Sequence, residues 1–403
     1  MGVKLLAATY AYPPMRFPRA VQIARLLSAF DDRDVAVLCA DEPEALDVGL
    51  QSAYPDGEKR VVRVPWTTRA AAYRRWRDRT LETRLLVPDR FRPWLRAAER
   101  AARRERLTDD AALLVTFGQP MSAHVLGLRL RRRHALPWIA HFSDPWVENP
   151  FRGDGRVARA ANERLERAVF ATADRLVFTS DETVDLVFAR YDAATRRKAV
   201  VVPHAFDPRL YRDAPRHSRE LVVRYLGAFY GARGPAHLLD ALRALDKTEL
   251  DGVHVELIGP HEHDLLPDAL RGLPDGLVSV RDPVPYLESL ELMRASDLLL
   301  VLDAPADRSV FLPSKLVDYL GARRPIVALT PPGTAASLVE HYGGWTADPT
   351  DAHASAAGLR AALAAARAMR HTDFGNPRVV ARYEIEQVAN EFRRLVTTQT
   401  AAK

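Results

Sequence analysis

Short apolar runs alternate with amphipathic runs along almost the whole chain, and this alternation constrains the fold more than any other feature. VKLLAATY (3–10) and AALLVTFG (111–118) have the length and composition of buried strands, whereas PRAVQIARLLSAF (18–30) has apolar residues at helical spacing. The pattern restarts at LVVRYLGAFY (221–230). Strands that alternate with helices in this way predict parallel sheets with helices on both faces.

The alternation is interrupted by a polar, proline-bearing stretch, DPRLYRDAPRHSRE (207–220). The chain has 403 residues, a length that suggests two or three domains. We therefore predict an α/β protein with two Rossmann-like, doubly wound domains facing a central cleft, formed by residues 1–207 and 208–376. Ligands of such sheets bind beyond the carboxyl ends of the strands, so the loops at those ends are the candidate sites.

The composition excludes several classes of protein. The only cysteine, Cys39, cannot form an intramolecular disulfide. The first apolar run is too short for a signal peptide, and Leu6 occupies the position where a myristoylation signal has Ser or Thr. No window approaches the roughly 18 apolar residues of a membrane span. We expect a soluble or peripheral protein.

The positive charge is concentrated in one segment. The net charge is +6, yet residues 63–106 alone contain 14 arginines and five acidic residues. Within 69–106 the arginines are interleaved with Tyr73, Trp76, Phe91 and Trp94. Such a surface attracts phosphate-rich partners. An anionic membrane surface and a solvated helical face are both open readings of this segment, and nucleic acid is not expected.

One lysine stands out in an arginine-rich chain. Only six of the 58 basic residues are lysines, and one of them lies in PSKLVDYLGARRP (313–325). Pro313 suits a helix start and Ser314 an N-cap, which puts Lys315 in the first helical turn. A cation there opposes the helix dipole unless an anion lies beside it. Asp318 shares the same face, so the pair is either a surface ion pair or a site for a diphosphate and sugar hydroxyls.

A second candidate phosphate site is the turn YLGAFYGARG (225–234). Gly227, Gly231 and Gly234 let the backbone approach a ligand, the following helix offers N–H groups, and Arg233 adds a cation. The spacing differs from the dinucleotide motif G-x-G-x-x-G. An ordinary strand–helix turn is the alternative reading.

In the first half, polar residues follow the predicted strands that end at 118 and 142. Asp144 is our preferred polar residue of the site, with a turn or cap role as its alternative. His124 is a candidate contact for a sugar or acceptor, and both it and His141 are alternatively structural. Arg16 and Arg19 lie in YPPMRFPRA (12–20), where they either meet an acceptor phosphate or are solvated.

These motifs together resemble a known family. YLGAFYGARGPAHLLDAL, ASDLLLVLDAP with FLPSKLVDYLGARRPIVAL, and ADRLVFTSDET with VPHAFD are similar in content and order to GT-B glycosyltransferases of the large retaining family 4. PWIAHFSDPW and VPDRFRPWLRAA also resemble the bacterial subgroup that makes surface polysaccharides and glycoconjugates. The resemblance covers nearly the whole chain.

The resemblance implies separate binding roles for the two domains. The second domain would bind a nucleoside-diphosphate sugar, the first would bind the acceptor, and residues 377–403 would form a helix that packs back on the first domain. The implied donor-binding residues are Gly227, Tyr230, Gly231, Arg233, Gly259, Pro285, Tyr286, Ser314, Lys315, Leu316 and Asp318. The implied catalytic residues are Asp144, His124, Arg233 and Lys315, and the implied acceptor-binding residues are Arg16, Arg19 and His141.

The chain departs from the family at one position. The E-x7-E motif of the family places its second carboxylate, a ribose ligand, at Asp318, but its first falls at Val310. Asp303 or Asp307 is a candidate replacement. PVPY (283–286) resembles the loop that contacts the base of the nucleotide through its backbone. We expect the mechanism of the family to be altered here.

The expected function is that of a retaining glycosyltransferase of the hexosyltransferase type. It would move a sugar from a nucleoside-diphosphate sugar to a glycan, glycolipid or other hydroxyl acceptor in polysaccharide or glycoconjugate biosynthesis. Neither a metal nor a cofactor is expected beyond the nucleotide-sugar co-substrate, since cations stabilise the leaving diphosphate. The expected location is the cytoplasm, either free or peripheral on the inner face of the plasma membrane. Alternatives are epimerisation, phosphorolysis, and a membrane-associated scaffold without catalysis.

Overall fold

The computed structural model describes residues 4–42, 46–65, 87–212, 219–229, 232–259, 269–370 and 372–401. The chain forms two compact units. Unit 1 consists of Met1–Pro203 and Val388–Lys403, and unit 2 consists of His204–Gln387. The predicted limits were 207 and 376, so residues 377–387, which we had grouped with the C-terminal helix, are part of unit 2.

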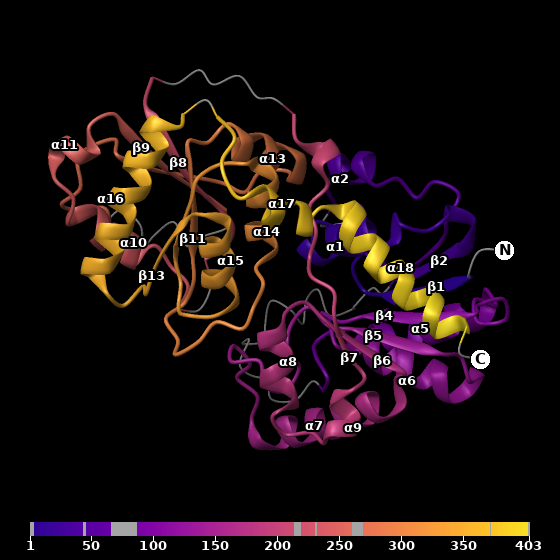
Figure 1. Ribbon diagram of the computed structural model, residues 1–403. Coiled ribbons are helices and arrows are strands. Elements are labelled where there is room, and N and C mark those ends of the chain that lie inside the picture. Colours follow the sequence, from indigo (N-terminus) through magenta and orange to yellow (C-terminus); the bar gives the residue numbers. More distant parts are fainter. Residues whose placement is uncertain are drawn as a thin grey trace. The chain divides into compact units, whose positions relative to one another are not determined.

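Unit 1 is built on a seven-stranded parallel sheet, coloured from indigo to magenta in Figure 1. Its strand order is β3-β2-β1-β4-β5-β6-β7. The strands are β1 (Leu5–Thr9), β2 (Val35–Asp41), β3 (Arg60–Pro65), β4 (Leu113–Phe117), β5 (Trp138–His141), β6 (Arg175–Phe178) and β7 (Ala199–Val201). All residues of β1, β4 and β5 are buried, as apolar strands of a sheet covered on both faces should be.

The described helices of unit 1 connect these strands. They are α1 (Pro18–Leu27), η1 (Asp32–Asp34, a 3₁₀ turn), α2 (Val48–Ala53), α5 (Arg92–Arg104), α6 (Ser122–His134), α7 (Arg156–Thr172), α8 (Asp181–Phe188) and α9 (Ala193–Arg196). The C-terminal helix α18 (Ile385–Ala401), yellow in Figure 1, also packs on this unit. Its Phe392 side chain is fully buried, with ring centres 6.0–6.2 Å from those of Phe30, Phe117 and His141. The predicted return of the C-terminal helix to the first domain is confirmed.

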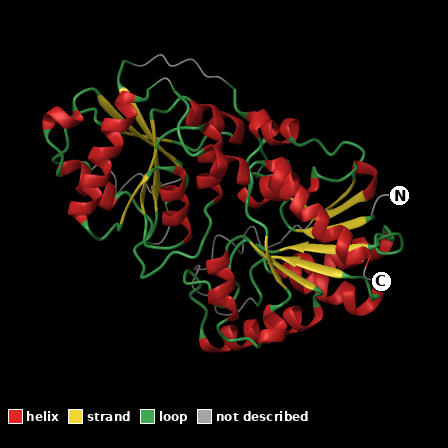
Figure 2. Ribbon diagram, in the orientation of Figure 1, coloured by secondary structure: helices red, strands yellow, loops and turns green. Residues whose placement is uncertain are grey.

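Unit 2 contains a six-stranded parallel sheet in the order β10-β9-β8-β11-β12-β13. Its strands are β8 (Leu221–Leu226), β9 (Val253–Ile258), β10 (Val278–Arg281), β11 (Leu298–Leu302), β12 (Ile326–Leu329) and β13 (Trp345–Ala347). Its described helices are η2 (Pro208–Leu210, a 3₁₀ turn), α10 (Ala236–Arg243), α11 (Lys247–Leu250), α13 (Tyr286–Arg294), α14 (Ser314–Ala322), α15 (Thr334–Tyr342), α16 (Ala352–Ala368) and α17 (Pro377–Arg382). Figure 2 shows both sheets in yellow with red helices around them.

The topology confirms the predicted α/β class with two Rossmann-like sheets. In each sheet the strand order changes direction at a central pair, β1 and β4 in unit 1 and β8 and β11 in unit 2. Such switch points are where ligands of open parallel sheets bind. Two apolar clusters lie in unit 2, and helix α14 contributes buried residues such as Leu316, Val317 and Leu320 to one of them. Among the described helices, none is long and apolar enough to cross a membrane.

The attachment of α18 to unit 1 can be tested by truncating its central aromatic side chain. Because Phe392 is fully buried, Phe392→Ala leaves a cavity, and we expect it to lower the free energy of unfolding by about 3–5 kcal/mol in urea denaturation. Phe151→Ala is the matched control, since Phe151 is 52% exposed and should change stability by less than about 0.5 kcal/mol. Equal effects of the two substitutions would contradict this packing.

Candidate functional site

The carboxyl-end loops of unit 2 meet beside the switch point between β8 and β11. Gly227 follows β8, and its N–H donates to the Ile258 carbonyl at 2.8 Å. Gly259 follows β9, and a Cβ atom there would lie 1.8 Å from the Gly227 carbonyl oxygen. The two glycines, with φ of +148° and +154°, therefore let the two loops touch. Both were predicted donor-binding residues, and the backbone of Gly227 fills the space beside Gly259.

Lys315 points into this corner from the first turn of α14. Its Nζ lies 3.7 Å from the ring centre of Tyr225, and a Cβ atom on Gly227 would lie 2.7 Å from the same nitrogen. The ammonium nitrogen is buried and has no hydrogen-bond partner among the described residues. The alternative of a surface ion pair with Asp318 is therefore wrong, because Lys315 is directed inward toward β8.

Burial governs the charge of Lys315. Loss of hydration lowers the pKa of Lys315 well below its ordinary value, the nearby Arg233 lowers it further, and Asp303 acts in the opposite direction. The cation–π contact with Tyr225 stabilises the charged form by about 2 kcal/mol. Desolvation of an ion costs several kcal/mol, which is the larger effect.

The second cation of the corner is paired. Nη2 of Arg233 donates to Oδ1 of Asp303 at 2.5 Å, and the two side chains are 11% and 6% exposed. Asp303 follows β11, and its Oδ2 accepts from the Thr330 hydroxyl, at the end of β12, at 2.8 Å. The predicted replacement for the missing carboxylate at Val310 was Asp303 or Asp307. Asp303 holds Arg233, while Asp307 is exposed.

Asp318 and Tyr286 are brought together. The Tyr286 hydroxyl donates to Oδ1 of Asp318 at 3.2 Å, and the Tyr211 hydroxyl donates to the backbone carbonyl of Asp318 at 2.8 Å. Asp318 is buried, so these tyrosines fix its position one turn beyond Lys315. Pro285 is the N-cap of α13, directly before Tyr286.

Three predictions about neighbouring residues need correction or fall outside the described chain. Ser314 was predicted to be an N-cap, but the extended Pro313 (ψ 127°) occupies that position, and Ser314 begins the helix without a capping side-chain bond. Leu316 is fully buried in the apolar core. Tyr230 and Gly231, also predicted at the donor site, lie outside the described residues.

In unit 1, Arg19 and His141 are in direct contact. Arg19 lies on α1 and is 3% exposed, so the predicted solvated loop charge is wrong for this residue. Its Nε donates to the Gly118 carbonyl at 2.9 Å and its Nη1 to Gln22 Oε1 at 3.0 Å. Its Nη2 donates to the His141 carbonyl at 3.1 Å and lies 2.9 Å from His141 Nδ1. Arg16 is exposed.

Arg19 is a buried cation with neutral hydrogen-bond partners and no ion pair to a described residue. Burial lowers the pKa of Arg19 to about 9, and the negative charge of Asp144 opposes that decrease. Arg19 therefore remains charged at neutral pH. It joins the ends of β4 and β5 to α1, at the edge where ligands of such sheets bind.

His124 lies inside unit 1 in the first turn of α6. Its Nδ1 is 2.8 Å from the Thr116 hydroxyl, and its ring centre is 4.0 Å from that of Phe142. Burial, and secondarily Arg19, lower the pKa of His124 well below its ordinary value, so the ring is neutral. Its Nε2 has no partner among the described residues and points at Gly118, where a Cβ atom would lie 2.4 Å away.

The loop between β5 and α7 carries Asp144 and is held by the buried face of α7. The Val147 N–H donates to Glu166 at 2.9 Å, and the Tyr191 hydroxyl donates to the same carboxylate at 2.7 Å. The Trp146 indole N–H donates to Asn162 at 3.1 Å. Burial raises the pKa of Glu166 despite these donors. The half-buried Asp144 therefore lies on a loop that is held in place by hydrogen bonds to α7.

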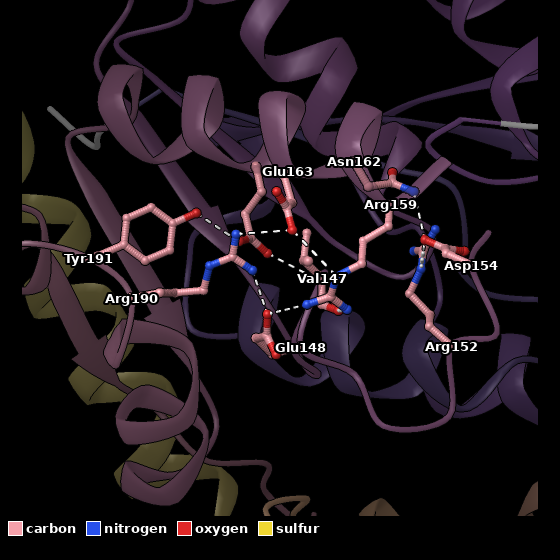
Figure 3. Close-up of polar contacts among 10 residues, drawn as sticks. Val147, Glu148, Arg152, Asp154, Arg159, Asn162, Glu163, Arg190 and Tyr191 are labelled. Carbon is pink, nitrogen blue, oxygen red and sulfur yellow. Dashed lines mark hydrogen bonds and ion pairs between the residues drawn. The ribbon is translucent and has the colours of Figure 1, made fainter. Parts of the chain in front are cut away.

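Figure 3 shows the charged side chains around the same loop. Glu148 accepts from Arg159 at 2.8 Å and also pairs with Arg190. Both arginines reach Glu163, at 3.4 Å and 3.3 Å. Further along the loop, Arg152 pairs with Asp154 and Asn162 donates to the same carboxylate. These contacts connect the loop to α7 and to the residues after α8.

The sequence did not single out Tyr225, Thr330 or Glu166. Tyr225 lies two residues before Gly227, so alternation along the strand was the available signal for its position. Thr330 and Glu166 act through contacts between segments far apart in the sequence, which residue spacing does not reveal. Among the described residues, no group of three or more His, Cys, Asp or Glu side chains is arranged to hold a metal ion.

Comparison of sequences finds no match among protein-family models or curated proteins. In three dimensions the chain is similar to Anabaena HepE, solved in complex with UDP, with a TM-score of 0.69, 14% identity, and 98% and 100% of the two chains covered. It is also similar to the sucrose-phosphate synthase of Thermosynechococcus elongatus (TM-score 0.70, 15% identity, 99% and 100% covered). A third similar structure is the lipopolysaccharide outer core galactosyltransferase WaaB (TM-score 0.63, 11% identity, 98% and 99% covered). These neighbours are GT-B glycosyltransferases, and the chain has the GT-B fold.

The buried side-chain nitrogen of Lys315, which has no hydrogen-bond partner among the described residues, should reduce the stability of the free protein. We expect Lys315→Met to raise the free energy of unfolding by about 1–3 kcal/mol at pH 7, because it removes a poorly hydrated amine. The unfolded chain binds a proton at this lysine up to about pH 10.4, and the folded chain loses that proton at a lower pH. The stability of the wild type should therefore rise with pH in this window relative to the variant.

Urea denaturation between pH 7 and pH 10 measures both effects. Lys198→Met is the matched control, since Lys198 Nζ donates to the carbonyls of Phe170, Ala171 and Ala173 at 2.9–3.0 Å. Loss of these bonds should destabilise the protein, with the sign opposite to that of Lys315→Met. A destabilising Lys315→Met substitution would contradict the described environment of Lys315.

Proposed function

We propose that the protein is a glycosyltransferase that takes a sugar from a nucleoside-diphosphate sugar bound by unit 2. The observation that carries the proposal is the side-chain nitrogen of Lys315, which is buried beside Arg233 without a hydrogen-bond partner among the described residues. It lies at the switch point of a sheet in a GT-B fold. A diphosphate supplies the acceptor oxygens that this nitrogen lacks. HepE, of the same fold, has been solved with UDP and with UDP-glucose.

The proposed chemistry uses positive charge at the leaving group. As the bond to the sugar breaks, negative charge develops on the diphosphate, and Lys315, Arg233 and the N–H groups at the start of α14 stabilise it. Asp318, held by Tyr286, accepts from the ribose hydroxyls. With these cations no metal is required. We infer a retaining reaction, as in the family that the motifs resemble.

Unit 1 is proposed to bind the acceptor, a glycan, glycolipid or other hydroxyl compound of polysaccharide or glycoconjugate biosynthesis. Asp144 would supply negative charge near the reacting sugar. Arg19, with its buried positive charge, suits an acceptor that carries an anionic group. A scaffold without catalysis is the second candidate, favoured by the buried Val310 at the position of a family carboxylate.

Binding and turnover of donors test the proposal. The protein should bind at least one of UDP, GDP and dTDP in a thermal-shift screen, because a ligand of the native state raises its melting temperature. It should also slowly hydrolyse the corresponding sugar nucleotide in the absence of acceptor. Binding without any hydrolysis or transfer would support the scaffold. If the protein shows no binding and no hydrolysis, both donor-site functions are contradicted.

The proposed contact of Lys315 with the diphosphate has a specific signature. Lys315→Ala should weaken binding of the nucleoside diphosphate by about 10- to 100-fold, the cost of a lost charged hydrogen bond. Binding of the matching nucleoside, which has no phosphate, should change little. Lys198→Ala, far along the chain from this corner, is the control. Equal loss for both ligands, measured by calorimetry, would exclude the phosphate role.

A peripheral membrane role is proposed through the exposed face of α5. Trp94 is fully buried, and Phe91 packs at 4.3 Å between ring centres on the buried Tyr10, so the described aromatic residues of the basic segment do not form an inserting surface. Apart from Pro93, the exposed residues of α5 are basic instead: Arg92, Arg96, Arg100, Arg103 and Arg104. The part of the segment from 69 to 86 lies outside the described residues. Binding would therefore be electrostatic.

Vesicle binding distinguishes this surface from an ordinary solvated helix. The double substitution Arg96→Glu and Arg100→Glu should reduce co-sedimentation with vesicles of 30% anionic lipid by about tenfold or more, since each basic residue near the surface contributes about 1 kcal/mol. Salt should have the same effect on the wild type. Arg164→Glu with Arg167→Glu, on the exposed face of α7, is the control. Equal loss in both double variants, or none, would reject the assignment to α5.

A further inference from the structure

We propose that Lys315 is a neutral amine in the free protein and takes up a proton from solvent when a nucleoside diphosphate binds, so that donor binding is coupled to protonation. The inference rests on the proposed donor site. It goes further by assigning a protonation state to the free site and a proton to the binding reaction.

The geometry of the free site does not support an ammonium ion. Lys315 Nζ is buried between the face of Tyr225 and the backbone of Gly227. An ammonium ion has three N–H donors, and none of them finds an acceptor among the described residues. The ring of Tyr225 replaces part of the lost hydration. A neutral amine in this position loses much less hydration than an ammonium ion does.

The charged groups around Lys315 also favour the neutral form. Arg233, from the segment before α10, and Asp303, at the end of β11, form an ion pair with each other. The hydroxyl of Thr330, which is uncharged, donates a hydrogen bond to the second oxygen of Asp303. On α14 itself, Asp318 lies one turn away and accepts from Tyr286. The described carboxylates are therefore engaged elsewhere, and Tyr225 is the titratable group on β8 that faces the amine.

A bound diphosphate reverses this balance. Its oxygens provide acceptors for all three N–H groups, and its negative charge favours the ammonium ion over the amine. No bond of the ligand breaks in this step, because the proton passes from water or buffer to Nζ. The start of α14 adds the positive end of the helix dipole to the same anion.

The residue type fits this role. Arginine supplies 52 of the 58 basic residues of the chain, and it stays protonated at any physiological pH. Lysine loses its proton readily when it is buried. The chain therefore has a lysine at the position where the proton is exchanged, and an arginine at Arg233, where a permanent ion pair with Asp303 exists.

The coupling predicts how affinity depends on pH. Between the pKa of Lys315 in the free protein and its higher pKa in the complex, the complex holds one more proton than the separate partners. The dissociation constant for UDP should therefore rise with pH in this window, by up to tenfold per pH unit. Below the window the dependence should disappear.

Calorimetry with UDP measures the proton directly. Titrations at pH 8 in two buffers of different ionisation enthalpy give the number of protons exchanged, and at this pH the terminal phosphate of UDP has already lost its own proton. We expect uptake of close to one proton per UDP by the wild type. GDP and dTDP serve as second and third probes if UDP is not the bound nucleotide.

Two variants make the result specific. Lys315→Arg keeps a cation that cannot lose its proton, so any binding it retains should occur without proton uptake. Lys198→Arg, the matched control, should take up the same number of protons as the wild type. Binding by the wild type without proton uptake would overturn the inference and leave the proposed function standing. Failure of all three nucleotides to bind would overturn the proposed donor site together with the inference.

Discussion

The burial of the Lys315 side-chain nitrogen, without a hydrogen-bond partner among the described residues, is the constraint around which the proposed donor site of unit 2 is organised. Buried apolar residues of α14 hold the helix against the sheet, and the Lys315 side chain extends from its first turn toward Tyr225 on β8. The absence of a side chain at Gly227 leaves the space that Lys315 Nζ occupies. Loss of hydration costs an ammonium ion more free energy than the contact with Tyr225 recovers. A charged Lys315 is therefore unfavourable in the free protein and favourable in a complex with an anion.

The two buried basic side chains of this corner, Arg233 and Lys315, are accommodated in different ways. Arg233 cannot lose its proton, and Asp303, bonded to Thr330, neutralises it. Lys315 has no such partner among the described residues and can lose its charge. In the neutral form of Lys315 the three side chains together carry no net charge. In the proposed mechanism, such a site is buried at modest cost in the free protein and becomes electropositive only as a diphosphate enters.

The fold was predictable because it depends on a pattern that extends over the whole chain, whereas the site depends on single contacts. Strand and helix alternation predicted both sheets, and i,i+3 spacing correctly placed Lys315 and Asp318 on one helix. Spacing did not show that Lys315 points toward β8 while Asp318 accepts from Tyr286. The burial of Arg19 depends on the carbonyls of Gly118, directly after β4, and of His141 in β5, which are 99 and 122 residues away. Trp94 is buried because it lies on the same apolar face of α5 as Leu95, Ala98 and Ala101. The charges of this segment, on which the sequence prediction rested, do not reveal that spacing.

The altered carboxylate position has a structural context of its own. Ser309, next to Val310, is bonded to the segment before α15: its N–H donates to the Pro332 carbonyl at 2.9 Å, and the Thr334 N–H donates to its carbonyl at 3.0 Å. Gly333 is required there, since a Cβ atom would lie 1.9 Å from the Ser309 carbonyl oxygen. Val310 is therefore fixed and 7% exposed, and a carboxylate at this position would lose most of its hydration. Asp303 cannot move to replace it without releasing Arg233. In the proposed donor site, the groups for the diphosphate and the ribose are therefore separate from those for the transferred sugar, which would rely on groups other than the first family carboxylate.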